Sequence, residues 1–344
     1  MNNAITPAQT KDGAIVDQAP PKPFVIVWRV LEQCNLSCPF CAYDKRLAFP
    51  RRVADRNEVN RMVRLLADWQ GQTNRPVLLS WLGGEPTLWR DLDETSALAA
   101  SGGLLQGLTT NGTTLGSKPV RDLLLSRFAN VTFSIDGFGG FHDPMRGWKG
   151  AFAKLRRNIT RLQEDKLSRS SPVILRANVV LMHQNLADFP ALCRELATWG
   201  IREITFNQLG ESDRPEFYPA HKLQPGDVSD LRHMLPDLRA ELSQAGTTLL
   251  GGDQYITRIA EIASGIPFKV GRCGIARDFW FVDEAGAIAP CSFVRRHFGL
   301  TINDIRTVRD IARLGNRLCA FQHETPASEC GNCMSTQQFS KFDL

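Results

Sequence analysis

The chain has 344 residues, of which 43% are hydrophobic and 22% charged, so it can bury a substantial globular core. Its net charge of +5 is mild, and its short basic stretch, Pro50-Arg51-Arg52, is typical of a surface turn rather than a nucleic-acid site. No apolar run approaches the roughly 18 residues of a membrane span. The polar, proline-rich start lacks the apolar region of a signal peptide. We therefore expect a cytoplasmic protein with no membrane or nucleic-acid partner.

Short β-rich runs alternate with amphipathic helical patterns from residue 24 onward. The predicted strands are 24–30, 77–82, 104–108, 131–135, 173–182 and 204–206. Helices are predicted around 59–69, 92–100, 120–125, 152–162 and 186–199, the last with Asn185 as a candidate N-cap. Six βα units predict a parallel sheet, and they are too few for a full eightfold barrel. We predict an α/β fold, a partial (β/α)6 TIM-like barrel, with its active site at the carboxyl ends of the strands.

The pattern changes after about residue 210. Helices are predicted near 228–245 and 256–263, followed by short strands at 278–282 and 287–289 and a helix from 305 to about 318. We predict a disordered segment at 1–23, a barrel at 24–210 and a connecting region at 211–272. Residues 273–344 are predicted to form a small β-hairpin and helix module.

Nine cysteines favour metal ligation, because the number is odd and cytoplasmic thiols stay reduced. Cys34, Cys38 and Cys41 lie within eight residues, directly after the first strand. Three thiolates can satisfy three irons of a four-iron cube and leave the fourth iron open for a ligand. The alternative is zinc, which in structural sites usually needs a fourth ligand nearby.

This CxxxCxxC pattern, with the aromatic Phe40 before its third cysteine, resembles the signature of the radical S-adenosylmethionine (SAM) superfamily. Further motifs follow the later strands in the same order as in that family, over about residues 24–208. They are Gly83-Gly84-Glu85-Pro86, Thr110-Asn111-Gly112, Ser134-Ile135-Asp136-Gly137 and His142-Asp143-x-x-Arg146-Gly147.

The resemblance implies a [4Fe–4S] cluster held by the three cysteines and SAM bound at its open iron. The cofactor-binding residues it implies are Phe40, Gly83, Gly84, Glu85, Pro86, Ser134 and Asp136. The Gly83–Pro86 motif holds the methionine amino group, and the polar residues after the fourth strand approach the ribose. Reduction of SAM then gives a 5′-deoxyadenosyl radical, which abstracts hydrogen from an unactivated carbon. Gly84 is expected to permit a close backbone approach.

A second group comprises Cys273, Cys291, Cys330 and Cys333. Gly286 permits a hairpin turn that brings the first two together, and the following helix returns the chain to the closing CxxC pair. Spacing alone allows iron–sulfur or zinc. The pattern resembles the twitch subdomain, a shortened SPASM module, which implies a second, fully ligated [4Fe–4S] cluster that accepts an electron.

Two cysteines stand outside these groups. Cys193 lies on an apolar helix face and is predicted to be core, and Cys319 is predicted to be buried near the second group, where it could also be a proton donor or substitute ligand. Other polar residues near the predicted active edge are more typical of structural positions. They are His183, Asn207, Gln208, Glu211, Asp253 and Tyr255.

These observations predict a radical SAM oxidoreductase that oxidises or cross-links a ribosomally made peptide, reduced by a partner such as flavodoxin or ferredoxin. The alternative substrate is a small metabolite, such as an aminocyclitol or sugar, that undergoes dehydrogenation. A scaffold protein with two zinc sites is the hypothesis from another class, and it predicts no cleavage of SAM.

Overall fold

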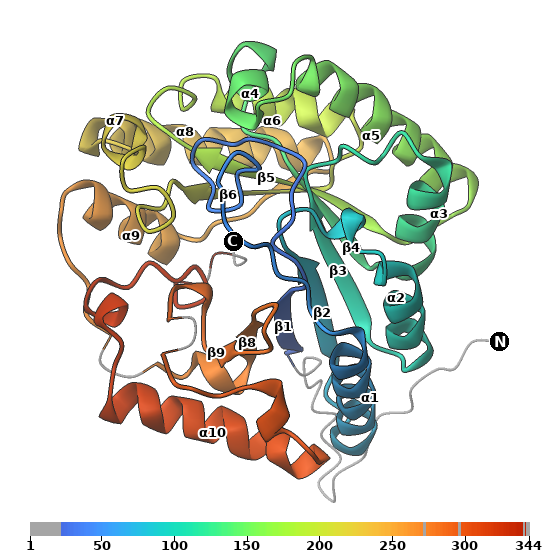
Figure 1. Cartoon of the computed structure of the whole chain (residues 1–344). Helices are drawn as coiled ribbons and strands as arrows, with labels where there is room; N and C mark the ends of the chain where they lie inside the picture. Colours follow the sequence, from blue (N-terminus) through green and yellow to red (C-terminus); the bar gives the residue numbers. More distant parts are fainter. Residues whose placement is uncertain (1–21, 271–272, 295–296, 340, 342–344) are drawn as a thin grey trace, which may run out of the picture.

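The computed structural model describes residues 22–270, 273–294, 297–339 and 341. Nine strands form one sheet in the order β7-β6-β5-β4-β3-β2-β1-β8-β9. Neighbouring strands are parallel except β8 and β9. The strands curve around a central space, with helices on the outside (Figure 1). Since β7 and β9 are the two edges, the barrel is partial, as predicted.

The strands are β1 (Phe24–Arg29), β2 (Val77–Leu82), β3 (Leu105–Thr110), β4 (Asn130–Ser134), β5 (Ile174–Leu181), β6 (Glu203–Gln208), β7 (Thr248–Leu249), β8 (Phe279–Val282) and β9 (Ile288–Ala289). The α-helices are α1 (Arg56–Thr73), α2 (Leu92–Ser101), α3 (Lys118–Arg127), α4 (Gly139–Arg146), α5 (Ala151–Ser168), α6 (Phe189–Thr198), α7 (Tyr218–His221), α8 (Pro225–Gln244), α9 (Asp253–Ala263) and α10 (Val308–Glu324). None of these described helices is both long and apolar enough to cross a bilayer.

Alternation along the strands separates the packed core from the inside of the barrel. In β5, Leu175, Ala177, Val179 and Leu181 are fully buried in the hydrophobic core. The residues between them, Arg176, Asn178 and Val180, point to the opposite face because successive side chains alternate. This face carries the polar groups described below.

Several elements were not predicted. The helix α4 starts with two glycines and contains Pro144, which are poor helix formers. Tertiary contacts therefore stabilise it: the His142 side chain accepts a hydrogen bond from the Asp136 backbone, and Arg146 pairs with the Asp136 carboxylate. The short β7 and α7 were missed as well, because two and four residues carry no periodic signal.

The prediction that Asn185 caps a helix is wrong. The helix α6 begins at Phe189, after Asp188. The buried Asn185 amide instead donates to the backbone oxygens of Asp136 and Val180, at 2.7 and 2.9 Å. Asn185 therefore joins the loop after β4 to the end of β5.

The first strand after Cys273 continues the barrel sheet. β8 pairs in parallel with β1, with Val25 opposite Phe279 and Trp28 opposite Val282. Beyond this pairing, the Arg29 guanidinium donates to Glu284 at 2.7 Å, and both side chains are buried. The predicted boundary at residue 273 thus crosses a continuous sheet, because backbone pairing extends the barrel by this strand. Of the predicted disordered segment, residues 1–21 lie outside the described part of the chain.

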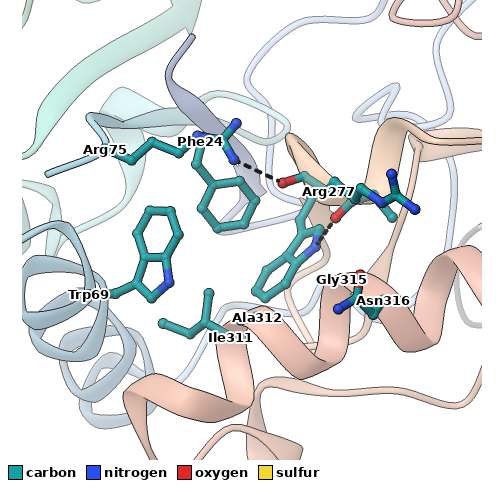
Figure 2. A pocket seen from close by; sticks show the side chains of 10 residues that line it. Phe24, Trp69, Arg75, Arg277, Ile311, Ala312, Gly315 and Asn316 are labelled. Atoms are coloured by element: carbon teal, nitrogen blue, oxygen red, sulfur yellow. Dashed lines mark hydrogen bonds between the residues drawn. The ribbon is translucent and has the colours of Figure 1, made fainter. Parts of the chain in front are cut away.

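A cavity of about 210 Å³ lies at the amino end of β1, between α1, β8 and α10. Figure 2 shows Phe24, Trp69 and Ile311 around it. The Phe24 ring contacts Trp69 at 5.3 Å and Trp280 at 4.9 Å between centroids. The cavity is at the end of the strand opposite the cysteine loop. It is a packing gap between the module and the barrel, away from the predicted active edge.

Candidate active site

The loop that follows β1 lies at the carboxyl edge of the sheet (Figure 1), and it carries Cys34, Cys38 and Cys41. Each sulfur accepts a hydrogen bond from an N–H group, and the Leu36 backbone is an additional donor to Cys34. The donors to Cys34, Cys38 and Cys41 are, respectively, the Asn111 side chain at 3.8 Å, the Arg146 guanidinium at 3.9 Å and the Tyr43 backbone N–H at 3.4 Å. N–H donors around sulfur ligands orient them and tune a cluster that they hold. The donor set therefore fits a cluster with three thiolate ligands.

The environment of these thiols disfavours their charged form. Burial raises the pKa of all three thiols, that of Cys41 to about 12, and neighbouring cysteines further raise the pKa of Cys34 and Cys41. This mutual effect shows that the three sulfurs lie near one another. The thiols are consequently neutral without a metal, and cluster binding must release their protons.

Gly83 and Gly84 lie against the segment that leads into the cysteine loop. Their loop is fixed by hydrogen bonds from Gly84 N to Leu31 O and from Glu85 N to Gln33 O, both 2.8 Å. A Cβ atom on Gly84 would lie 2.1 Å from Gln33 O, and one on Gly83 2.6 Å from Leu31 O. The close backbone approach that we expected at Gly84 therefore brings it against Gln33, the residue before Cys34.

The Glu85 carboxylate is fully buried and held by protein donors. Its Oε1 accepts from the Thr87 backbone, the Thr87 hydroxyl and the Thr110 hydroxyl, at 3.1, 2.6 and 2.7 Å. Its Oε2 accepts from Asn111 N at 2.7 Å. Burial raises the pKa of Glu85, and these hydrogen bonds oppose that rise. Glu85 thus positions Asn111, the residue that donates to Cys34.

A buried ion pair connects the end of β4 to the cysteine loop. Arg146 Nη2 lies 2.6 Å from Asp136 Oδ2, while Arg146 Nη1 donates to Cys38. Asp136 Oδ1 also accepts from Val180 N at 3.0 Å. Burial raises the pKa of Asp136, and Arg146 acts against that rise. The buried Asp136–Arg146 ion pair therefore links β4 and β5 to Cys38.

Phe40 and Gly147 also contribute to the contact between α4 and the cysteine loop. The Arg146 guanidinium lies 5.3 Å from the centre of the Phe40 ring, within cation–π range. Gly147 has φ of +58°, and a Cβ atom there would lie 2.0 Å from Ser37 Oγ. Only glycine fits this turn against the cysteine loop.

The remaining predicted cofactor contacts lie at the same edge. Ser134 is the last residue of β4, and Pro86 opens a short 3₁₀ turn that Glu85 caps. The structure thus brings together the motif residues after β1, β2, β3 and β4. The contacts predicted between these residues and SAM stay predictions.

The second cysteine group gathers around the β8–β9 hairpin and the end of the chain. The hairpin turn has Gly286 at φ of +80°, where its N–H donates to Asp283 O at 2.9 Å. Burial raises the pKa of Cys273 to about 11 and that of Cys291 to about 12. Cys333 raises both of these values and Cys330 raises that of Cys273, so the four sulfurs share one neighbourhood.

Arg258 of α9, a residue that sequence reasoning did not identify, organises the CxxC loop. Its buried guanidinium donates to Cys333 O at 2.9 Å and to the Asn332 side chain. The Phe268 backbone pairs with the same loop, since Cys333 N donates to Phe268 O at 2.9 Å. The sequence offered no signal for Arg258, because its partners lie more than seventy positions later in the chain.

We predict that Arg258→Leu loosens the CxxC loop. The change removes the Arg258 donor to Cys333 O and one of the two donors to the Asn332 side chain, which costs roughly 2–4 kcal/mol. Hydrogen exchange measured by mass spectrometry should show faster exchange in 325–339 and unchanged exchange in β1–β4. Arg194→Leu is the matched control, because that arginine pairs with Glu241 on the surface and should change little. Equal protection in both variants would contradict this role of Arg258.

Cys193 is fully buried in the core, so its predicted structural role is confirmed. Cys319 on α10 is only partly buried, contrary to the prediction, and lies close enough to Cys273 to raise its pKa. Helical geometry explains the difference: the residues facing the core are Ile311, Leu314, Gly315, Leu318 and Gln322.

The other polar residues that the sequence placed near the active edge lie away from the cysteine loop. Tyr255 is buried, and its hydroxyl donates to Phe206 O at 3.2 Å and lies 3.4 Å from Asn207 Oδ1. Asp253 and Glu211 are exposed. His183 is exposed as well and lies 2.8 Å from the Asp227 carboxylate. Only Asn207 and Tyr255 thus belong to the inside of the barrel.

Together, the parallel partial barrel and the three-thiol loop at its carboxyl edge define a barrel enzyme with an iron–sulfur site. Residues 28–196 match the family model described as the radical SAM superfamily. Residues 28–196 are therefore a radical SAM domain, and the cofactors of this superfamily are SAM and a [4Fe–4S] cluster.

The chain is similar to several known proteins at modest sequence identity. The chain is 32% identical to the "Fe-coproporphyrin III synthase" of Methanosarcina barkeri over 186 residues, which are 54% of this chain and 44% of that protein. It is 21% identical to the "PqqA peptide cyclase" of Bradyrhizobium diazoefficiens, over 87% of this chain and 74% of that one. The structure of SuiB from Streptococcus suis bound to SAM matches with a TM-score of 0.63 at 17% identity, over 91% of this chain and 72% of that chain. The last similarity supports the fold.

Proposed function

We propose that this radical SAM enzyme holds its cluster on Cys34, Cys38 and Cys41 and modifies a ribosomally made peptide. The observation that carries the first part is the set of three neighbouring thiols, each of which accepts a hydrogen bond from an N–H donor. When bound, the cluster and SAM supply the radical that takes hydrogen from the substrate. The chain's own part is to orient these ligands through Glu85, Asn111 and Arg146 and to exclude water from the barrel.

The family match supports a cluster over zinc at the first site, because the radical SAM superfamily uses SAM with a [4Fe–4S] cluster. A single zinc ion needs its thiolates about 2.3 Å away from one point. Among the described residues, no group of three Cys, His, Asp or Glu side chains is arranged to hold one metal ion. A four-iron cube needs three or four neighbouring thiolates, which both cysteine groups can supply. We therefore propose a second [4Fe–4S] cluster on Cys273, Cys291, Cys330 and Cys333.

A peptide substrate is supported by similar proteins. One is named a peptide cyclase, one is the sporulation killing factor maturation protein SkfB of Bacillus subtilis, and one SuiB structure is described as bound to its precursor peptide SuiA. The small-metabolite alternative is not favoured by these similarities. The similarity to the Fe-coproporphyrin III synthase of Methanosarcina barkeri makes a reaction of iron porphyrin synthesis the second candidate. A low-potential reductant such as flavodoxin or ferredoxin, and a cytoplasmic location, complete the proposal.

The test is anaerobic reconstitution with iron and sulfide. We expect about eight irons per chain, four for each cube. Dithionite-reduced protein should convert SAM to methionine and 5′-deoxyadenosine, measured by liquid chromatography. Protein that binds only zinc, or that leaves SAM intact, would overturn the proposal. Added precursor peptides and iron porphyrins, compared for coupled product formation, distinguish the two substrate classes.

A further inference from the structure

The helix α10 brings a buried glutamine to the second cysteine group. Gln322 is 2% exposed, and its side-chain Oε1 accepts a hydrogen bond from Cys273 N at 3.1 Å. Cys319 lies three residues earlier on α10, so its side chain neighbours that of Gln322. Cys319 is also close enough to Cys273 to raise the pKa of that thiol. Gln322 therefore lies on the part of α10 that contacts the cysteine group, in direct contact with a predicted ligand residue.

The orientation of the Gln322 amide follows from this hydrogen bond. A backbone N–H can only donate, so the amide atom that faces Cys273 N must be the oxygen and not the nitrogen. The amide nitrogen, Nε2, is bonded to the same carbon as this oxygen and therefore stays close to Cys273. Nε2 is buried, and among the described residues it has no hydrogen-bond acceptor. The amide thus offers donor hydrogens that the described part of the chain does not use.

A second buried donor lies beside the closing CxxC pair. Ser335 is 3% exposed, and its backbone N–H donates to the Cys333 sulfur. Its hydroxyl is buried as well and has no partner among the described residues. Within the described part of residues 273–344, Gln322 and Ser335 carry the buried side-chain atoms that lack a partner. Two separate segments therefore place an unused donor next to a predicted cluster ligand.

The other donors around this group point to sulfur as the common acceptor. The Ile275 backbone N–H donates to the Cys273 sulfur, and the Phe293 and Val294 backbones donate to that of Cys291. Unpaired buried donors are rare in folded proteins, and a bound ion is one reason for them. An iron–sulfur cluster offers negatively charged sulfurs as acceptors. Gln322 and Ser335 thus fit a four-thiolate cluster at this position.

Hydrogen bonds to sulfur affect how readily such a cluster is reduced. Reduction adds one negative charge, and a donor hydrogen interacts more strongly with the more negative state. A donor therefore stabilises the reduced cluster more than the oxidised one and raises the reduction potential.

We propose that Gln322 is a positioning residue that donates an N–H to a sulfur of the second [4Fe–4S] cluster and raises the reduction potential of that cluster. The inference rests on the proposed function, because it assigns a residue to the cluster proposed for the second cysteine group. The Ser335 hydroxyl is a further donor of the same kind. A higher potential makes this fully ligated cluster a better electron acceptor, which is the role predicted for it.

The experiment observes the second cluster alone. The parent protein is the full-length chain with alanine at the three cysteines of the first site. Gln322→Met removes the amide at similar side-chain length, and Gln244→Met, at the exposed end of α8, is the matched control. An anaerobic redox titration followed by electron paramagnetic resonance (EPR) gives the midpoint potential. Pulsed EPR on reduced protein, labelled with the heavy nitrogen isotope in its glutamine side chains, detects a glutamine nitrogen beside the cluster.

We expect Gln322→Met to weaken the reduction equilibrium roughly tenfold, a shift of about 59 mV to lower potential for a one-electron couple. The glutamine nitrogen signal should be present in the parent and in Gln244→Met and absent in Gln322→Met. Gln322→Glu is the second variant, because it keeps the oxygen that accepts from Cys273 N and removes the nitrogen. The nitrogen signal should be absent there as well, even where Gln322→Met fails to hold a cluster.

An unchanged potential in Gln322→Met would overturn the inference. So would a parent protein with about four irons and no glutamine nitrogen signal, or a signal that persists in either Gln322 variant. A parent protein that binds no iron would instead overturn the proposed second cluster.

Discussion

Replacing Cys34, Cys38 and Cys41 with alanine is expected to remove about four of eight irons per chain and to abolish cleavage of SAM. Each change removes one iron ligand from the loop after β1. The donors from Asn111, Arg146 and Tyr43 would then have no sulfur to orient. Iron content and 5′-deoxyadenosine are measured on the same anaerobic preparation. The loss should be complete, because no other described thiol lies in this loop.

The matched variant replaces Cys330 and Cys333. It should also lose about four irons, yet retain cleavage at saturating SAM, because the first site is left intact. A folding probe is needed too, because metal ligation contributes folding energy. Cleavage that survives in the first variant, or full iron in either one, would contradict the assignment of the two sites.

Gly84→Ala is expected to lower the rate of SAM cleavage roughly 100-fold, which is the effect of displacing reacting groups by about 1 Å. The added Cβ atom would lie 2.1 Å from Gln33 O and 2.8 Å from Glu32 O, and backbone cannot move aside as a flexible side chain can. A displacement of Gln33 would also move Cys34, which follows it in the chain. Iron retention and 5′-deoxyadenosine formation report the effect.

Gly71→Ala makes the same chemical change in α1, where nothing lies within 4 Å of the new atom. Alanine favours a helix over glycine, so this control should keep full activity and equal or greater stability. If Gly84→Ala behaved like Gly71→Ala, the close approach would have no influence on the cysteine loop.

Much of the barrel could be predicted because its signals are local. Runs of β-branched residues and the helical spacing between them identified β1 to β6 and most of their helices. The structure confirms the partial barrel and places the GGEP segment, Asn111 and Arg146 around the cysteine loop. Short elements such as β7 and α4 were not predicted. They are stabilised by contacts with residues that are distant in the sequence.

The functions of individual motif residues depended on long-range contacts. Glu85 turned inward to hold Thr110 and Asn111, and Asp136 paired with Arg146. Nothing in the motif letters indicates that both carboxylates already have partners within the protein. These partners come from other strands, and only the sheet register brings them within hydrogen-bond distance.

The sequence by itself determined the two cysteine groups, the order of the βα units and the glycine at the hairpin turn, because each depends on residues close together in the chain. Only the tertiary structure decided that β8 extends the barrel beside β1, that Arg258 supports the CxxC loop and that Lys341 reaches Asn178 and Asn207. The physical reason is that a buried donor or cation must find partners wherever the fold provides them. For Lys341 those partners lie 163 and 134 positions away in the chain.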